Sequence, residues 1–117
     1  MEGRGLELAR TIVDILEDKK GEEIVLLDLT GICSFADFFV ICTGVSERTI
    51  RALADEVRQK VKAATGDLPR GMEGKAENGW VLLDYGVVIV HLFSADLRDY
   101  YRLEDLWHEG QMLLRMP

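Results

Sequence analysis

The first thirty residues combine one helical stripe with one short apolar run. Between Leu6 and Lys19 the apolar residues recur at three- and four-residue steps, which predicts an amphipathic helix. The stripe consists of Leu8, Ala9, Ile12, Val13, Ile15 and Leu16. Gly21 follows two lysines and is typical of a helix C-terminus. The run from Ile24 to Leu29 is short, apolar and rich in branched residues, and predicts a buried strand.

The next segment predicts a strand followed by a long helix. Residues 38–43 are apolar, rich in strand formers and too few for a free-standing helix, so we expect a strand that stops at Gly44. Ser46 is a favourable N-cap for a helix that closes at Gly66. The apolar positions of this helix keep helical spacing and are Ile50, Leu53, Ala54, Val57, Val61 and Ala64.

Turn signals dominate residues 66–79, where we expect mostly turns and one short edge strand around residues 70–73. Two strand-like runs, residues 80–85 and 87–93, then meet at Asp84-Tyr85-Gly86, which indicates a hairpin. Ser94 caps a final helical region. Its apolar and aromatic residues are Leu97, Tyr100, Tyr101, Leu103, Leu106 and Trp107.

This order of elements predicts an α/β (α+β) fold. Strands joined through a long helix normally run parallel, whereas a hairpin is antiparallel, so we expect a mixed sheet of about five strands with helices packed on it. A chain of 117 residues has the usual size of one domain, and we expect a single domain over residues 1–117.

Charge and cysteine content narrow the class of protein. The chain has 14 Lys and Arg against 21 Asp and Glu, a net charge of −7. Such a surface repels a phosphate backbone and favours a basic protein partner, so direct sequence-specific nucleic-acid binding is not expected. No run approaches the roughly 18 apolar residues of a membrane-spanning helix, and no secretory segment is visible, so we expect a cytoplasmic protein. Cys33 and Cys42 lie in no CxxC or Cys/His cluster, which favours buried thiols.

The sequence offers little for catalysis. Gly44-Val45-Ser46 lies between a strand and a helix N-terminus, where a phosphate can bind, but no Walker lysine or Rossmann glycine triplet surrounds it, and helix capping is favoured. A nucleotidyltransferase needs paired carboxylates on a strand for magnesium, and no predicted strand contains Asp-x-Asp. His91 and His108 accompany no nucleophile elbow. We expect no enzyme, cofactor or metal, and keep a nucleotide-binding or nucleotidyltransferase-like enzyme as the alternative.

Strand alternation divides the hairpin into two faces. The core-like positions are Val81, Leu83, Val88, Val90 and Leu92. The opposite face mixes aromatic, polar and aliphatic side chains, a mixture that is enriched in protein interfaces, and holds Trp80, Leu82, Asp84, Val87, Ile89, His91 and Phe93. An interface role and a core role fit Trp80 equally well, whereas a core role is favoured for Trp107.

Several motifs resemble the ribosomal silencing factor family, also called RsfS or Iojap. They are Gly79-Trp80-Val81-Leu82-Leu83-Asp84-Tyr85-Gly86, Val90-His91-Leu92-Phe93 and Arg98-Asp99-Tyr100-Tyr101-Arg102-Leu103-Glu104-Asp105-Leu106-Trp107. Upstream, Asp28-Leu29, residues 34–38, Ile41-Cys42-Thr43-Gly44 and Gly71-Met72-Glu73-Gly74 also look like that family, so the resemblance covers nearly the whole chain. One departure is Val87, where the family usually carries an acidic residue.

The resemblance implies a nucleotidyltransferase-like fold without the catalytic carboxylates. It also implies a translation repressor that binds the large ribosomal subunit through its fourteenth protein, blocks association with the small subunit when nutrients are scarce, and forms a homodimer when free. For the partner-binding residues, Trp80 and Tyr85 are candidate aromatic anchors and Asp84 a charge or turn contact. His91, Phe93 and Tyr100 are further candidates. Trp80 and Tyr85 have opposite strand parity and share a contact only if Tyr85 belongs to the hairpin tip.

Overall fold

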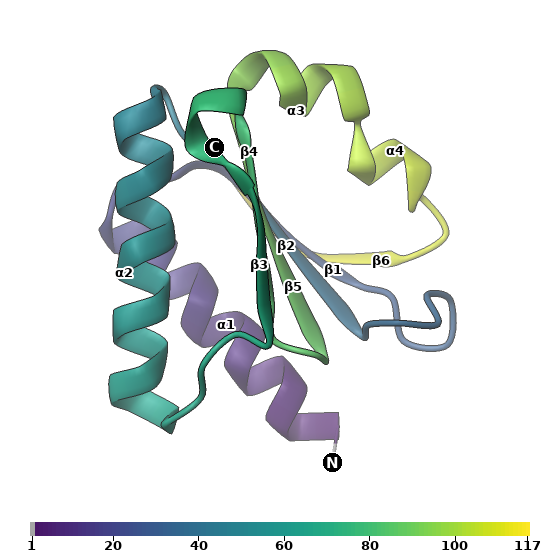
Figure 1. The fold of residues 1–117 in the computed structure, drawn as a ribbon. Coiled ribbons are helices and arrows are strands. Elements are labelled where there is room, and N and C mark those ends of the chain that lie inside the picture. Colours follow the sequence, from purple (N-terminus) through teal and green to yellow (C-terminus); the bar gives the residue numbers. More distant parts are fainter. Residues whose placement is uncertain (1) are drawn as a thin grey trace.

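The computed structural model describes residues 2–117, which form helices on both sides of one sheet (Figure 1). The helices are α1 (Glu2–Asp18), α2 (Glu47–Thr65), α3 (Ala95–Tyr101) and α4 (Leu103–Leu106), with a short 3-10 turn η1 at Ala76–Asn78. The strands are β1 (Glu22–Asp28), β2 (Phe38–Thr43), β3 (Gly71–Lys75), β4 (Trp80–Asp84), β5 (Val88–Phe93) and β6 (Gln111–Met116). Apart from β6, each of these helices and strands overlaps a segment for which the sequence predicts the same type of element.

The sheet is mixed, as predicted, and has the strand order β3-β4-β5-β2-β1-β6. β2 and β5 pair in parallel, and the other neighbouring strands pair antiparallel. The six strands exceed the predicted number by one because the sequence pattern predicts no strand over residues 111–116. β6 is an edge strand with no fully buried residue, so it lacks the strong apolar pattern of an inner strand. The relation to nucleotidyltransferases remains a prediction.

Helix α2 has the predicted ends. The Ser46 side chain accepts a hydrogen bond from the backbone N–H of Thr49 at 3.1 Å, and Gly66 follows the helix in the left-handed conformation. Both features satisfy backbone groups that a helix terminus leaves without partners. Ser46 and Gly66 therefore cap the two ends of α2.

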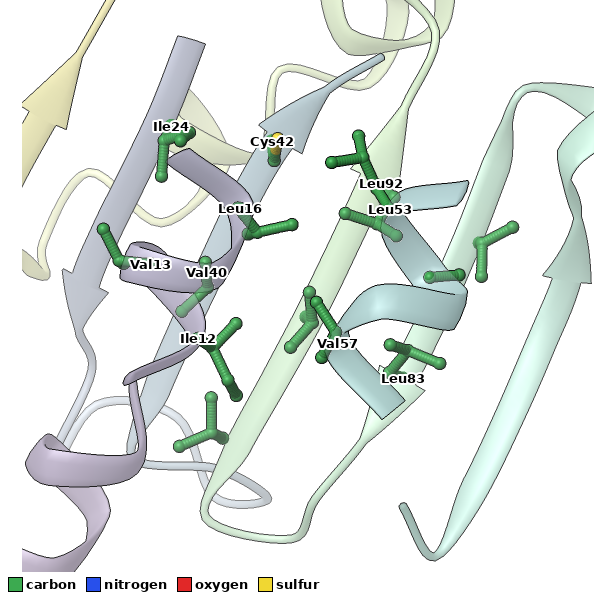
Figure 2. Packing of buried hydrophobic residues seen from close by; sticks show 14 of the residues in the cluster. Ile12, Val13, Leu16, Ile24, Val40, Cys42, Leu53, Val57, Leu83 and Leu92 are labelled. Atoms are coloured by element: carbon green, nitrogen blue, oxygen red, sulfur yellow. The ribbon is translucent and has the colours of Figure 1, made fainter. Parts of the chain in front are cut away.

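The main hydrophobic core lies between the sheet and helices α1 and α2. Figure 2 shows Ile12 and Leu16 of α1 and Leu53 and Val57 of α2 pointing at strand residues such as Val40. The hairpin residues predicted as core are all buried there, namely Val81, Leu83, Val88, Val90 and Leu92. Both cysteines are buried free thiols, and burial raises the pKa of Cys42 to about 12. The alternation of side chains along the two hairpin strands therefore predicted correctly which hairpin residues face this core.

The opposite face of the sheet is covered only in part. Helices α3 and α4 lie over it, together with the loop between β1 and β2 (Figure 1). A second hydrophobic cluster forms under them and includes Phe39, Ile41, Ile89, Phe93 and Leu103. Across residues 2–117, none of the helices has both the length and the apolar character needed to cross a membrane.

Candidate functional site

Aromatic side chains gather on the sheet face opposite α1 and α2, which we call the aromatic face. Its centre consists of Trp80 on β4, His91 and Phe93 on β5, and Phe39 on β2. These residues share one side because Trp80 pairs with Phe93, and Leu82 with His91, across the antiparallel β4–β5 ladder. The parallel β2–β5 register places Phe39 on the same side. The strand parity of the hairpin predicts that Trp80, His91 and Phe93 share this face, whereas Phe39 was not assigned to it from the sequence.

Trp80 is the half-buried centre of this face. Its ring stacks on Phe93 with centroids 5.3 Å apart and packs against Tyr101 of α3 at 5.0 Å. Its indole nitrogen donates a hydrogen bond to Nδ1 of His91 at 3.3 Å. Trp80 is thus held by a strand neighbour, a helix residue and a polar contact, while the residue as a whole is only partly buried. It combines the core role and the surface role that the sequence leaves open.

His91 and Phe93 lie beneath this accessible surface. Phe93 is fully buried and His91 is 4% exposed. Burial lowers the pKa of His91 to about 4, so its imidazole is neutral near pH 7. Both side chains support Trp80 from below, and in this conformation neither offers a surface to a protein partner.

Asp84 and Tyr85 separate at the hairpin tip. Oδ1 of Asp84 accepts a hydrogen bond from the backbone N–H of Gly86 at 2.7 Å, and its carboxylate lies within 3.4 Å of Arg70. Asp84 therefore closes the turn. Tyr85 packs instead against the α1/α2 core, where burial raises its pKa to about 12. Its hydroxyl is buried there and has no hydrogen-bond partner among the residues that the structure describes. The structure does not bring Tyr85 onto the face that holds Trp80.

The aromatic face extends to residues that the sequence did not single out for binding. Phe39 lies 4.7 Å from the His91 ring and 5.8 Å from that of Trp107, which is half-buried. Phe35, in the loop before β2, lies 6.2 Å from Trp107 and is 58% exposed. Strand parity of residues 38–43 could have identified Phe39. No sequence signal places Phe35, because a loop has no fixed periodicity.

The segment 95–109, which we call the α3–α4 arm, borders this face with an acidic surface. Its acidic residues are Asp96, Asp99, Glu104, Asp105 and Glu109. They outnumber its two arginines, Arg98 and Arg102. Arg98 pairs with Glu104, and Arg102 lies within 3.9 Å of Asp99 and Asp105. Tyr100 and Leu106 are its most exposed large apolar side chains, at 76% and 68%. An exposed set of aromatic, aliphatic and acidic groups suits a basic protein surface with an apolar groove.

The geometry at the alternative nucleotide site supports helix capping. The backbone N–H of Gly44 donates to the carbonyl of Phe93 at 2.8 Å, and the Ser46 hydroxyl is bonded to Thr49. A side chain at Gly44 would collide with Ile50, so the glycine allows the close approach of α2. Within residues 2–117, no group of three or more His, Cys, Asp or Glu side chains is arranged to hold a metal ion.

Comparisons with known proteins agree on one family. Residues 4–115 match the family model described as "Ribosomal silencing factor during starvation". Ribosomal silencing factor RsfS of Halalkalibacterium halodurans is 45% identical over 104 residues, which cover 89% of this chain and 88% of the relative. The protein of the same name from Bacillus subtilis is 42% identical over 96 residues, covering 82% and 80%.

A solved structure is similar throughout. The crystal structure of a Chromobacterium violaceum protein has 39% sequence identity and a TM-score of 0.82, and the match covers 88% of this chain and 85% of that one. The family model, the relatives and the fold confirm the resemblance seen in the motifs between Gly79 and Trp107. The chain is therefore a member of the ribosomal silencing factor family.

Proposed function

We propose that this protein represses translation by binding the large ribosomal subunit through its fourteenth protein. In this proposal the bound protein occupies space that the small subunit needs, so the two subunits do not associate. The family description includes starvation, and repression when nutrients are scarce is the corresponding role. The action is steric, takes place in the cytoplasm and needs no catalysis or cofactor.

The observation that carries this proposal is the half-buried Trp80 beside the acidic α3–α4 arm. An aromatic ring that is fixed on one side and accessible on the other loses little conformational entropy when it binds, which is typical of interface anchors. The acidic side chains around it favour encounter with a basic protein and disfavour nucleic acid. Together they fit a basic ribosomal protein better than exposed RNA.

The candidate residues take different parts in this proposal. Trp80 and Tyr100 contact the partner directly, because both offer accessible aromatic surface. His91 and Phe93 fix the orientation of Trp80 from below. Asp84 holds the hairpin turn through its bond with Gly86, and its carboxylate places a negative charge at the hairpin tip. Tyr85 acts indirectly, because its ring anchors the hairpin tip to the helix side of the sheet.

The test uses purified large and small subunits. The protein should co-sediment with large subunits and reduce their association with small subunits, and Trp80→Ala should weaken both effects. Leu68→Ala is a matched control, because Leu68 is an exposed apolar residue that lies beside Tyr85 on the helix side. Unchanged subunit association at saturating protein would contradict the proposal, as would equal losses in the two variants.

Two further points need their own measurements. We propose a homodimer for the free protein, supported by the two sheet edges, β3 and β6, that have no neighbouring strand. Light scattering would detect the dimer, and a monomer at all concentrations would contradict it.

The alternative enzyme function requires magnesium-dependent nucleotide binding at residues 44–46. Calorimetry with ATP and magnesium tests it, and the hydrogen bonds already made by Gly44 and Ser46 predict no binding heat.

A further inference from the structure

Arg98 is a buried arginine that joins three elements. Its Nη1 donates to Oγ1 of Thr43 on β2 at 2.8 Å. Its Nε and Nη2 both donate to Oε2 of Glu104 on α4, at 3.0 and 2.8 Å. The residue is 9% exposed, which is unusual for arginine unless the charge is paired. One guanidinium group therefore ties α3 and α4 to the centre of the sheet.

The α3–α4 arm needs such a tie because its backbone is strained. Arg102, between the two helices, has a φ of 46°, in the left-handed region that is unfavourable for a residue with a β-carbon. Strained backbone of this kind persists only when the surrounding structure holds it in place. Both helices are also too short to be stable by themselves. The direct bonds from Arg98 to Glu104 cross this bend and fix its angle.

The position of Arg98 determines where the exposed aromatic side chains lie. Arg98 and Tyr101 are three residues apart on α3 and share its inner side. Tyr101 contacts Trp80 there, with ring centroids 5.0 Å apart. Tyr100 is 76% exposed and packs edge-on against Tyr101, also with ring centroids 5.0 Å apart. Displacement of α3 would therefore move Tyr101 off Trp80 and change the direction of Tyr100.

The chemistry of the pair explains why arginine occupies this position. Partial burial by itself would raise the pKa of Glu104. The hydrogen bonds and charge of Arg98, together with a backbone hydrogen bond and the charge of Arg115, outweigh this effect and leave the pKa below its ordinary value. Glu104 is thus ionised and accepts two bonds from one planar group. A lysine ammonium is a single point charge and lacks the planar set of N–H donors that a guanidinium holds in fixed directions. It therefore cannot bond Thr43 and Glu104 in the same geometry.

We propose that Arg98 is a positioning residue, which holds the α3–α4 arm as a docking element for a basic protein surface with an apolar groove. Arg98 does not touch the partner. It fixes Tyr101 on Trp80 and so presents Tyr100, Leu106 and the acidic side chains of the arm in one arrangement. The docking role rests on the proposed function, whereas the effect of Arg98 on the arm can be measured in the free protein.

The first measurement is amide hydrogen exchange of the free protein. Arg98→Met should accelerate exchange of residues 95–106 by about tenfold or more while β2 and β5 stay protected, because the arm opens locally. Arg98→Lys should have a smaller effect. Arg48→Met is the control, because it removes an exposed guanidinium from α2. Arg102 is unsuitable as a control, because its own side chain bonds Asp99 of α3 and lies within 3.9 Å of Asp105 of α4. Unchanged exchange of the arm in Arg98→Met would overturn the inference.

The second measurement is affinity for large ribosomal subunits. Arg98→Met should weaken binding about tenfold, and Arg48→Met should not, although both variants lose the same charge. In a protein that already carries Tyr100→Ala, Arg98→Met should reduce the affinity for large subunits by a smaller factor than it does in the wild type. The effects of two residues that act through one contact are not additive. Additive losses, or equal losses in the two methionine variants, would overturn the positioning role.

Failure of the proposed function gives a different result. If the wild-type protein does not bind large subunits, the docking role fails, and the exchange measurement still decides whether Arg98 holds the arm. If Arg98→Met does not fold, Glu104→Gln replaces it in both measurements. That substitution keeps the shape of the side chain and removes its charge, so smaller changes in the same direction are expected. No change in either measurement would again overturn the inference.

Discussion

The indole N–H of Trp80 donates to Nδ1 of His91 across neighbouring strands, at 3.3 Å. The proton of the neutral imidazole is then on Nε2, which is buried and has no hydrogen-bond partner within residues 2–117 as described. A second proton would have to bind at Nδ1, where it would remove the acceptor of Trp80. This single bond links the protonation of a buried residue to the orientation of the most accessible aromatic side chain at the centre of the aromatic face.

The stability that His91 contributes should fall as the pH is lowered. Its pKa is about 4 in the folded protein against 6.5 for the free side chain, so between these values the unfolded chain binds more protons. The contribution is fully present above pH 6.5 and is lost towards pH 4, by roughly 3 kcal/mol. Urea unfolding at several pH values, with His91→Gln compared to wild type, measures it.

The difference between wild type and His91→Gln should shrink as the pH falls. His108→Gln is the control, because it removes a histidine at an exposed position. A difference that stays constant from pH 7 to pH 4 would show that His91 titrates normally or not at all in this range.

Gly74 should tolerate no side chain. It has a φ of 82°, and a β-carbon there would collide with the carbonyl oxygen of Trp80 on the neighbouring strand. Gly74→Ala should therefore cost roughly 3 kcal/mol of unfolding free energy and displace Trp80. Gly66 is a matched control, with a φ of 81° and open space around it, so Gly66→Ala should cost only about 1 kcal/mol. Equal losses in the two variants would mean that the collision is relieved by movement of β3.

The core between α2 and the sheet should respond strongly to truncation. Leu53 has no exposed surface and packs in the main core, so Leu53→Ala should lower the unfolding free energy by about 2–5 kcal/mol. Leu68→Ala removes the same atoms from a side chain that is 59% exposed, and should change the unfolding free energy by about 0.5 kcal/mol or less. Chemical denaturation provides both values, and similar values for the two variants would contradict the assigned core.

An acidic residue at position 87 should strengthen partner binding. Val87 is 44% exposed at the hairpin, its side chain lies next to Gly5 of α1, and its backbone carbonyl accepts hydrogen bonds from the N–H groups of Asp37 and Phe38. Val87→Asp should raise affinity for large subunits about threefold at low salt, because it adds a charge that attracts a basic partner. The gain should vanish at high salt and be absent in Val87→Asn. A gain in both variants would point to a steric cause.

The sequence by itself determined the elements that carry strong local signals. Helix α2 has a serine cap, a glycine end and an apolar stripe, and the hairpin alternates between two faces, so their ends and buried sides could be predicted. Strand parity also placed Trp80, His91 and Phe93 on one face. These features depend on residues near one another in the chain, where spacing alone decides which side chains meet.

Only the tertiary structure decided how the aromatic face is covered. Edge strand β6 forms by pairing with β1, which is distant in sequence, and its own residues have no strong pattern. The bend at Arg102 and the bonds from Arg98 to Thr43 and Glu104 bring α3 over Trp80 and leave His91 and Phe93 beneath the surface. Parity says which side a strand residue faces. Whether that side is open depends on contacts between distant segments, which no local pattern encodes.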